Sequence, residues 1–440
     1  MGWERIGRVV ALLAVAAGGA LVSAQTLPSD PLGSVAERYV RLVLAIGQHD
    51  PDYVDAFYGP PEWRTEAASG TADLAALDQQ AAAIEADLVR APMAEPASGD
   101  AELWRLRRQY LTGQLAAVRA KLAMLQSKTF TCDEESRALY DATAPVHTEA
   151  EFESVLRQLE ARLPGEGTLI ERYDRFKQAF VILPARLDRV FQEAIRACRE
   201  RTRQYIELPS DERFTVEYVT GKSWSGYNWY QGNYRSLIQV NTDLPVYIDR
   251  AVDLACHEGY PGHHVYNVLL EKHLMRDRGW IEYSVYPLFS PQSLIAEGTA
   301  NYGIEVAFPP ADRLRLEQDV LFPLAGIDGT RAKDYYDVLA LVDRLSYAGN
   351  EAARRYLNGS IDRAAAAAWL ERYALYTGPR AEQRVRFIDQ YRSYVINYNL
   401  GKDLVRAYVE KQAGRQATPA KRWQAFAALL SSPRLPSGLP

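Results

Sequence analysis

Three of the six histidines lie in the segment His257-Glu-Gly-Tyr-Pro-Gly-His-His264, and this segment restricts the folds open to the chain. Hydrolases with a His-Glu-x-x-His motif place two zinc-binding histidines one helical turn apart, and the glutamate between them activates water. Here Pro261 stands where the second histidine would be, and His263 and His264 follow two and three residues later. The segment therefore predicts a metal site that a regular helix cannot form.

The spacing of the histidines predicts where the helix breaks. On a straight helix, His257 and His264 would be two turns and about 10 Å apart, too far for two ligands that each lie about 2 Å from one ion. Pro261 cannot donate a hydrogen bond to the carbonyl of residue 257, and Gly262 relaxes the limits on the backbone. We therefore expect the helix to break here and to return His263 to His257 as the second ligand, with His264 as the alternative.

A third ligand is expected from a second helix. Ser290-Pro291 is a typical helix start, and Glu297 lies about two turns after it. Two histidines and one glutamate leave the fourth position open that a hydrolase requires, and they suit zinc, although manganese, cobalt and nickel accept the same donors. Asp253 lies four residues before His257 on the same helical face and is expected to hold its second imidazole nitrogen, unless it is a solvated charge.

Three segments of the chain, residues 241–245, residues 255–264 and Ala296-Glu-Gly298, resemble a large bacterial family of predicted zinc peptidases known as domain of unknown function 885. Its His-Glu-x-x-Pro-Gly-His-His signature is specific. Tyr398-Asn-Leu-Gly401 is similar to the family's Tyr-x-x-Gly, but the family usually has Pro-Gly-Gln shortly before, where this chain reads Arg392-Ser-Tyr-Val-Ile-Asn397. The resemblance implies a mostly helical, gluzincin-like fold and metal-dependent peptide hydrolysis.

A hydrolase site needs further groups around the metal. Glu258 is expected to take a proton from the metal-bound water and to pass it to the leaving amine. His264, Tyr302 and Tyr398 are candidates to donate a hydrogen bond to the tetrahedral oxyanion, with a buried structural role as the alternative for each. Arg235 is the candidate to bind a substrate carboxylate through two hydrogen bonds.

The hydropathy pattern predicts a mainly α-helical protein with one small β-sheet. Helical periodicity dominates residues 34–205 and resumes from residue 244 to about residue 412. Residues 214–220 and 236–241 alternate as strands do, and an aromatic, glycine-rich segment at residues 224–235 lies between them.

We expect the sheet, at about residues 213–241, to lie beside the metal-binding helix. An edge strand there could pair with an extended substrate, and an aromatic core under the helix is the alternative. Residues 25–212 are expected to form a helical scaffold, and residues 213–440 the sheet with the helical metal-site region, in one continuous body.

The charge balance argues against nucleic-acid binding. Lys and Arg number 51 and Asp and Glu number 56, so the formal net charge is -5 and no basic excess exists to attract phosphates. Three arginines near the carboxyl end, Arg384, Arg386 and Arg392, are expected to be solvated.

Residues 1–24 have the features of a secretory signal peptide. Arg5 and Arg8 precede an apolar stretch, and Val22-Ser-Ala24 is a small-residue cleavage site. The stretch is shorter than the roughly 20 residues of a membrane-spanning helix, which would be the alternative, and no later stretch suffices. We expect an exported protein, periplasmic or extracellular, with no stable membrane insertion after cleavage.

The three cysteines allow at most one disulfide. Cys132 and Cys198 are the expected pair, because Cys256 directly precedes the metal-site segment and is expected to be a small buried residue.

The leading hypothesis is an exported, zinc-dependent hydrolase of peptide bonds, of the carboxypeptidase or oligopeptidase type, with a peptide or small amide as substrate. A non-catalytic exported protein that binds zinc or peptide is the first alternative, and a metallohydrolase of non-peptide amides or esters is the second. The position of Glu258 beside His257 favours an enzyme, because a protein that only binds metal needs no general base.

Overall fold

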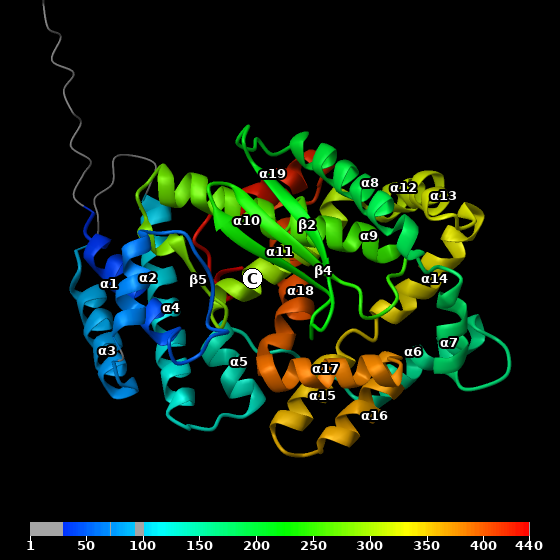
Figure 1. Ribbon diagram of the computed structural model, residues 1–440, viewed down its shortest axis with the longest axis horizontal. Coiled ribbons are helices and arrows are strands. Elements are labelled where there is room, and N and C mark those ends of the chain that lie inside the picture. The colour runs from blue at the N-terminus through cyan, green and yellow to red at the C-terminus, as the bar shows by residue number, and fades with distance from the viewer. Residues whose placement is uncertain (1–29, 71, 93–100, 440) are drawn as a thin grey trace, which may run out of the picture.

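The computed structural model describes residues 30–70, 72–92 and 101–439, so the predicted signal peptide lies outside the described residues. The described chain is mainly helical, with one three-stranded and one two-stranded sheet (Figure 1). This arrangement confirms the predicted fold class. No helix within the described ranges is both long and apolar enough to cross a membrane.

The first helices form the left side of the molecule in Figure 1. Helix α1 is amphipathic, and its buried residues Val35, Tyr39, Leu42 and Ile46 recur every three or four positions and pack against α3 and α4. The elements of this region are α1 (Gly33–Ile46), β1 (Val54–Phe57), α2 (Pro61–Ser69), α3 (Leu74–Arg90), α4 (Ala101–Leu125) and α5 (Cys132–Tyr140).

A second group of helices has a smaller apolar core of its own. Phe152, Trp369 and Tyr373 pack together there, and Thr148 begins the first helix of the group with a capping box. These helices are α6 (Glu149–Arg162), α7 (Leu169–Gln178), α14 (Ala332–Asp343), α15 (Ala348–Leu357), α16 (Arg363–Ala374) and α17 (Gly378–Tyr391).

The three-stranded sheet lies near the middle of the molecule (Figure 1). It consists of β2 (Arg213–Val219), β3 (Gly226–Gly232) and β4 (Arg235–Asn241), in the order β2-β4-β3, with β2 parallel and β3 antiparallel to β4. The two predicted strands are β2 and β4, and β3 forms within the aromatic segment between them. The sheet packs against the metal-site helices, as predicted.

The remaining helices connect the sheet to both helical groups. The longest are α8 (Pro184–Arg203), α11 (Pro291–Ala307), α18 (Ile396–Ala413) and α19 (Pro419–Leu430). The shorter elements are α9 (Asp249–Leu254), η1 (Ala255–Gly259), α10 (His263–Leu270), η2 (Glu271–Arg276), η3 (Ile281–Ser284), β5 (Val285–Pro287), α12 (Pro310–Leu316), η4 (Glu317–Leu321), α13 (Phe322–Ala325), η5 (Gly329–Arg331), η6 (Arg392–Val395) and η7 (Pro436–Gly438).

Helices α11 and α18 approach each other closely because each has a glycine at the contact. A Cβ at Gly298 would lie 2.5 Å from the carbonyl oxygen of Gly401, and a Cβ at Gly401 would lie 2.8 Å from the carbonyl oxygen of Leu294. Gly298 directly follows Glu297, and Gly401 lies one turn after Tyr398. The contact therefore brings these two functional candidates to one place.

The predicted disulfide between Cys132 and Cys198 is wrong. All three cysteines are free and buried, and the thiol of Cys198 contacts that of Cys256 instead. Burial raises the pKa of Cys256, and the adjacent Cys198 adds to the shift. Cys198 lies on α8, which packs against η1, the element that contains Cys256. Cys132 instead begins α5.

Candidate metal centre

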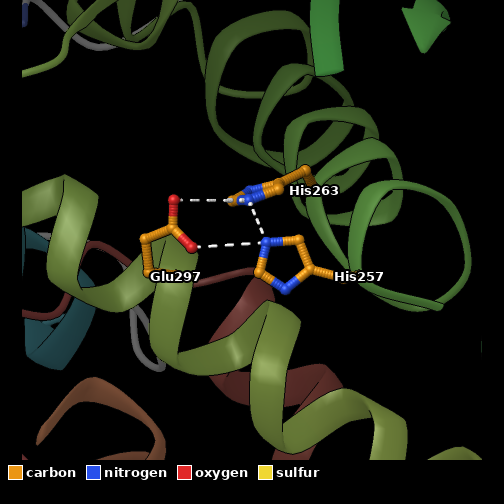
Figure 2. Close-up of side chains that lie close together, drawn as sticks. All are labelled: His257, His263 and Glu297. Atoms are coloured by element: carbon orange, nitrogen blue, oxygen red, sulfur yellow. Dashed lines mark hydrogen bonds and ion pairs between the residues drawn. The ribbon is translucent and has the colours of Figure 1, made fainter. Parts of the chain in front are cut away.

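Three side chains converge on one point, as Figure 2 shows: His257, His263 and Glu297. The two Nε2 atoms of the histidines are 3.1 Å apart. Glu297 Oε2 lies 3.3 Å from His257 Nε2, and Glu297 Oε1 lies 3.7 Å from His263 Nε2. The predicted ligand set is therefore brought together, with His263 as the second histidine.

The backbone forms this geometry through a widened helix and a break. After α9 the chain continues as a π-helix, η1, which carries His257, and it then breaks at residues 260–262 before α10 begins with His263. The Tyr260–Pro261 peptide is cis. A Cβ at Gly262 would lie 1.9 Å from the carbonyl oxygen of His257, so the break requires glycine. The predicted break is confirmed, whereas the π-helix before it was not predicted.

Glu297 is positioned by α11, which begins at Pro291 as predicted. The residue is only 5% exposed, and the hydroxyl of Tyr394 donates a hydrogen bond to its Oε1 at 2.9 Å. Its Oε2 atom is buried and has no hydrogen-bond partner. An ionised carboxylate oxygen in that position needs a cation or a proton nearby.

The donor set fits a metal ion. Two ligand atoms that each lie about 2.0–2.1 Å from a tetrahedral zinc ion are about 3.3 Å apart. The separations of 3.1, 3.3 and 3.7 Å between the three donors match this value closely. The group of two histidines and one glutamate could therefore hold a metal ion without large rearrangement.

Asn301 holds the ring of His257 and fixes its tautomer. The amide Nδ2 of Asn301 donates to the carbonyl oxygen of Glu297 at 3.0 Å, which leaves Oδ1 to accept from His257 Nδ1 at 3.2 Å. With its proton on Nδ1, His257 directs the lone pair of Nε2 toward Glu297. Asn301 lies four residues after Glu297, so one face of α11 supplies a ligand and the partner of another ligand.

The prediction that Asp253 holds His257 is wrong. The carboxylate of Asp253 pairs with Arg313 at 2.8 Å and with Arg250 at 3.1 Å. These two cations keep the pKa of Asp253 low even though burial alone would raise it. Arg313 lies on α12, and this distant helix draws Asp253 away from the metal centre.

Glu258 lies beside the three ligands. It is 4% exposed, and its Oε1 lies 4.0 Å from His257 Nε2. Asn228 of β3 donates to its backbone carbonyl at 2.7 Å, and Gly226 lets the same strand approach its carboxylate. Burial raises the pKa of Glu258, while His257 and His263 oppose the shift. A carboxylate with a raised pKa can both accept and release a proton near neutral pH.

His264 does not reach the metal centre. Its Nε2 lies 3.0 Å from Glu212 Oε2, its Nδ1 lies 2.8 Å from Ser236 Oγ, and it is fully buried. Burial lowers its pKa, and Glu212 opposes the shift. The alternative of His264 as a ligand and its predicted oxyanion role are therefore wrong, because α10 points adjacent histidines to different sides.

Two other predicted site residues lie away from the metal. The hydroxyl of Tyr302 donates to Glu410 at 3.0 Å on the far side of α11. Arg235 is exposed and pairs with Gly232, whereas Gly226 at the other end of β3 adjoins Glu258. Neither residue is placed to contact a substrate at the centre.

Tyr398 lies near the centre, as predicted. Burial raises the pKa of its hydroxyl, and the charges of Glu297 and Glu258 add to this while Arg384 opposes it. Its ring centroid is 5.9 Å from that of Tyr394, whose hydroxyl binds Glu297. Tyr394 was not predicted to take part, although it stands four residues before Tyr398 in one helical stretch.

Asp55 was also missed. It comes from β1, its Oδ1 accepts a hydrogen bond from Tyr227 at 2.9 Å, and burial raises its pKa to about 6. The charges of His263, Glu297 and Glu258 also act on it, so it belongs to the surroundings of the metal centre. The sequence signal was the single charge of Asp55 within the otherwise apolar run of residues 53–57.

The charges of the ligands depend on one another. Burial would lower the pKa of His263, but Glu297, Glu258 and Asp55 raise it to about 9. Burial would raise the pKa of Glu297, yet His263 and His257 hold it well below its usual value. A proton on His263 thus compensates the carboxylates that surround it.

No protein-family model matches the chain, and no curated protein matches its sequence significantly. The solved structures that are similar to the chain include two at low identity. A predicted lipoprotein from Colwellia psychrerythraea is 11% identical over 81% of this chain and 69% of that one, with a TM-score of 0.46. An M32 carboxypeptidase from Deinococcus radiodurans R1 is 14% identical over 92% of this chain and 91% of that one, with a TM-score of 0.43.

Proposed function

We propose that the chain is a zinc-dependent hydrolase of peptide bonds. The observation that carries this proposal is the convergence of His257, His263 and Glu297 within 4.8 Å of one another, with the carboxylate of Glu258 beside them. A set of three ligands leaves one coordination position open, which is typical of catalytic and not of structural zinc sites.

The chain's own residues divide the remaining work. A bound zinc ion would supply a Lewis acid for the scissile carbonyl and would acidify water. Glu258 accepts the proton of the attacking water at its carboxylate and then donates it to the leaving nitrogen, for which its raised pKa is suited. Tyr398, with its hydroxyl near Glu297 and Glu258, donates a hydrogen bond to the oxyanion.

The position of β3 supports a peptide as the substrate. β3 is an edge strand of its sheet, and Gly226 places its end against Glu258. An extended peptide can pair with such an edge through its backbone alone. Burial of Glu258 and Glu297 keeps bulk water away from the proton transfer, which strengthens the electrostatic interactions there.

We further propose that the protein is exported, on the basis of the charged start, apolar stretch and small-residue cleavage site in residues 1–24. Mass spectrometry of the amino terminus after expression in a bacterium with its native leader tests this. A mature terminus at Gln25 in the periplasm or medium is expected, and an uncleaved cytoplasmic chain would contradict it.

Elemental analysis of the purified mature protein tests the metal centre. About one zinc per chain is expected in the wild type and in Glu258→Gln, and its loss is expected in His257→Ala and Glu297→Ala. His264→Gln is the matched histidine control, because that side chain binds Glu212 and Ser236 and should leave zinc content unchanged. A wild type that takes up no metal when zinc is supplied would contradict the proposal.

Turnover tests the hydrolase itself. The zinc-loaded wild type should cleave members of a peptide library, and the Glu258→Gln variant should retain zinc but lose cleavage. Equal cleavage by both proteins would show that Glu258 is not the general base. Zinc binding with no cleavage of any peptide would instead indicate a binding protein or a hydrolase of other amides or esters.

A further inference from the structure

Arg384 of α17 is a half-buried cation with no carboxylate partner. Its guanidinium carbon lies 4.7 Å from the ring centroid of Phe387 and 5.6 Å from that of Tyr398. Its Nε atom is buried without a hydrogen-bond acceptor. Among the described residues it forms no ion pair. The sequence led us to expect a solvated guanidinium, but the buried Nε atom shows that Arg384 is not fully solvated.

Two other arginines with little exposed surface have carboxylate partners. Arg107 is fully buried and binds both carboxylate oxygens of Glu282, and Arg313 pairs with Asp253 at 2.8 Å. Taking part of a guanidinium out of water without an acceptor costs free energy, and a bound anion recovers it. Arg384 therefore has the properties of a site for an anionic ligand.

This cation lies near the metal centre, to which Tyr398 and Tyr394 connect it. Arg384 contacts the ring of Tyr398, and the hydroxyl of Tyr398 is subject to the charges of Glu297 and Glu258 as well as Arg384. Tyr394, which packs beside Tyr398, donates its hydroxyl directly to Glu297. Two tyrosine rings thus connect the guanidinium to the ligand set.

The surroundings of Arg384 are also positively charged, although the chain as a whole is acidic. Three arginines, Arg380, Arg384 and Arg250, together lower the pKa of the buried Tyr376 hydroxyl, against the effect of burial. Arg250 also acts on Glu258. An anion bound at Arg384 would therefore meet an attractive potential from these arginines.

We propose that Arg384 binds the free carboxylate at the carboxyl end of a peptide substrate. The inference rests on the proposed hydrolysis of peptides and restricts it to substrates with a free carboxyl terminus. A guanidinium binds a carboxylate through two parallel hydrogen bonds, which sets position and orientation together. Peptides with an amidated terminus lack this anchor and bind weakly.

A second uncompensated group defines the competing outcome. Asp55 forms no ion pair among the described residues, and its one hydrogen bond comes from Tyr227. It could bind the ammonium group at the amino end of a substrate. The carboxylate of Asp55 already accepts a hydrogen bond from Tyr227 and is stabilised by the charge of His263, so Arg384 is the less satisfied of the two.

The test measures binding separately from turnover. Zinc-loaded Glu258→Gln is titrated calorimetrically with an N-acetylated tripeptide as the free acid, as its carboxyl-terminal amide, and as the unacetylated amide. The free acid should bind about tenfold more tightly than its amide, since a hydrogen bond to a charged group contributes energy of this order. Introducing Arg384→Gln should abolish the difference, and Arg384→Lys should retain part of it.

Arg386→Gln is the matched control, because Arg386 is an exposed arginine two residues away on the same helix. This control should keep the full preference for the acid. Zinc content and thermal unfolding of each variant show whether the site is still loaded and folded.

Three results would overturn the role of Arg384. They are equal binding of acid and amide, a preference that persists in Arg384→Gln, and no binding of either peptide. A preference for the unacetylated amide would assign recognition to Asp55 instead.

The wild-type enzyme distinguishes this failure from failure of the proposed function. Cleavage of acid and amide at equal rates would retain the hydrolase and remove Arg384 from recognition. A carboxylate preference in binding without any cleavage by the wild type would retain Arg384 and contradict hydrolysis.

Discussion

Replacing Asn301 by alanine should weaken metal binding without removing a ligand. The Oδ1 atom of Asn301 accepts from His257 Nδ1 at 3.2 Å, and its Nδ2 donates to the carbonyl oxygens of Glu297 at 3.0 Å and of Tyr398 at 3.4 Å. The two Nδ2 contacts orient the amide so that Oδ1 faces the imidazole. In Asn301→Ala nothing orients the ring or keeps its proton on Nδ1.

The size of the effect follows from those contacts. Without the acceptor, His257 can place its proton on Nε2, and that tautomer cannot bind a metal ion through Nε2, the atom that faces Glu297. The ring also gains rotational freedom that metal binding must remove. Loss of such a partner typically lowers metal affinity by about 10- to 100-fold, or about 1.4–2.7 kcal/mol.

A competition titration against a chromogenic chelator of known zinc affinity, at fixed pH and ionic strength, measures this change. Asn301→Asp is the matched control, because it keeps an oxygen acceptor for His257 and should bind zinc at least as tightly as the wild type. An affinity of Asn301→Ala within about twofold of the wild type, in a protein that still unfolds cooperatively, would refute the reasoning.

Four further substitutions test the packing, the pH dependence and the assignment of the tyrosines. Gly401→Ala should lower the free energy of unfolding by about 1–3 kcal/mol in urea titrations, because the Cβ of the alanine would lie 2.8 Å from the carbonyl oxygen of Leu294 on α11. An unchanged free energy of unfolding would contradict the close contact between the two helices. Burial raises the pKa of Glu317 to about 8, so the folded state holds a proton that an unfolded glutamate loses near pH 4.3. The free energy of unfolding should therefore fall as the pH rises between about 4.5 and 8, by up to about 1.4 kcal/mol per pH unit. Glu317→Gln should reduce this slope in thermal unfolding measured across that range, and an unaltered slope would show that Glu317 is ionised throughout. Tyr398→Phe should lower kcat by about 10²- to 10³-fold with little change in zinc content. Tyr302→Phe should leave kcat unchanged, because the hydroxyl that it removes binds Glu410. The reverse result would exchange the roles of the two tyrosines.

The ligands could be predicted because their geometry is encoded locally. Donor type, spacing and the Pro-Gly pair all lie within eight residues, and the helical rise decides that only a broken helix can bring His263 to His257. The start of α11 at Ser290-Pro291 likewise fixed the position of Glu297. The same arithmetic could have excluded Tyr302, because five residues after Glu297 is about 140° around the helix.

The groups around the ligands could not be predicted in this way. Asp253 has the correct spacing to support His257, yet Arg313 from a helix 60 residues later in the chain takes it instead. Asn301 takes the position because of the way α11 faces η1, which no local pattern records. Asp55 and Tyr394 reach the centre from opposite ends of the chain, so only tertiary packing brings them there.

The supports of the centre are concentrated at one crossing of two helices. Glu297 and Asn301 occupy one face of α11, and α18 approaches that helix through Gly298 and Gly401 so closely that Tyr398 comes beside the ligands. Because these contacts are between backbones, small displacements of either helix move a metal ligand, the partner of a second ligand and the oxyanion donor together. Metal affinity and turnover are therefore coupled to the packing of α11 on α18, and a substitution there changes both even though it touches neither metal nor substrate.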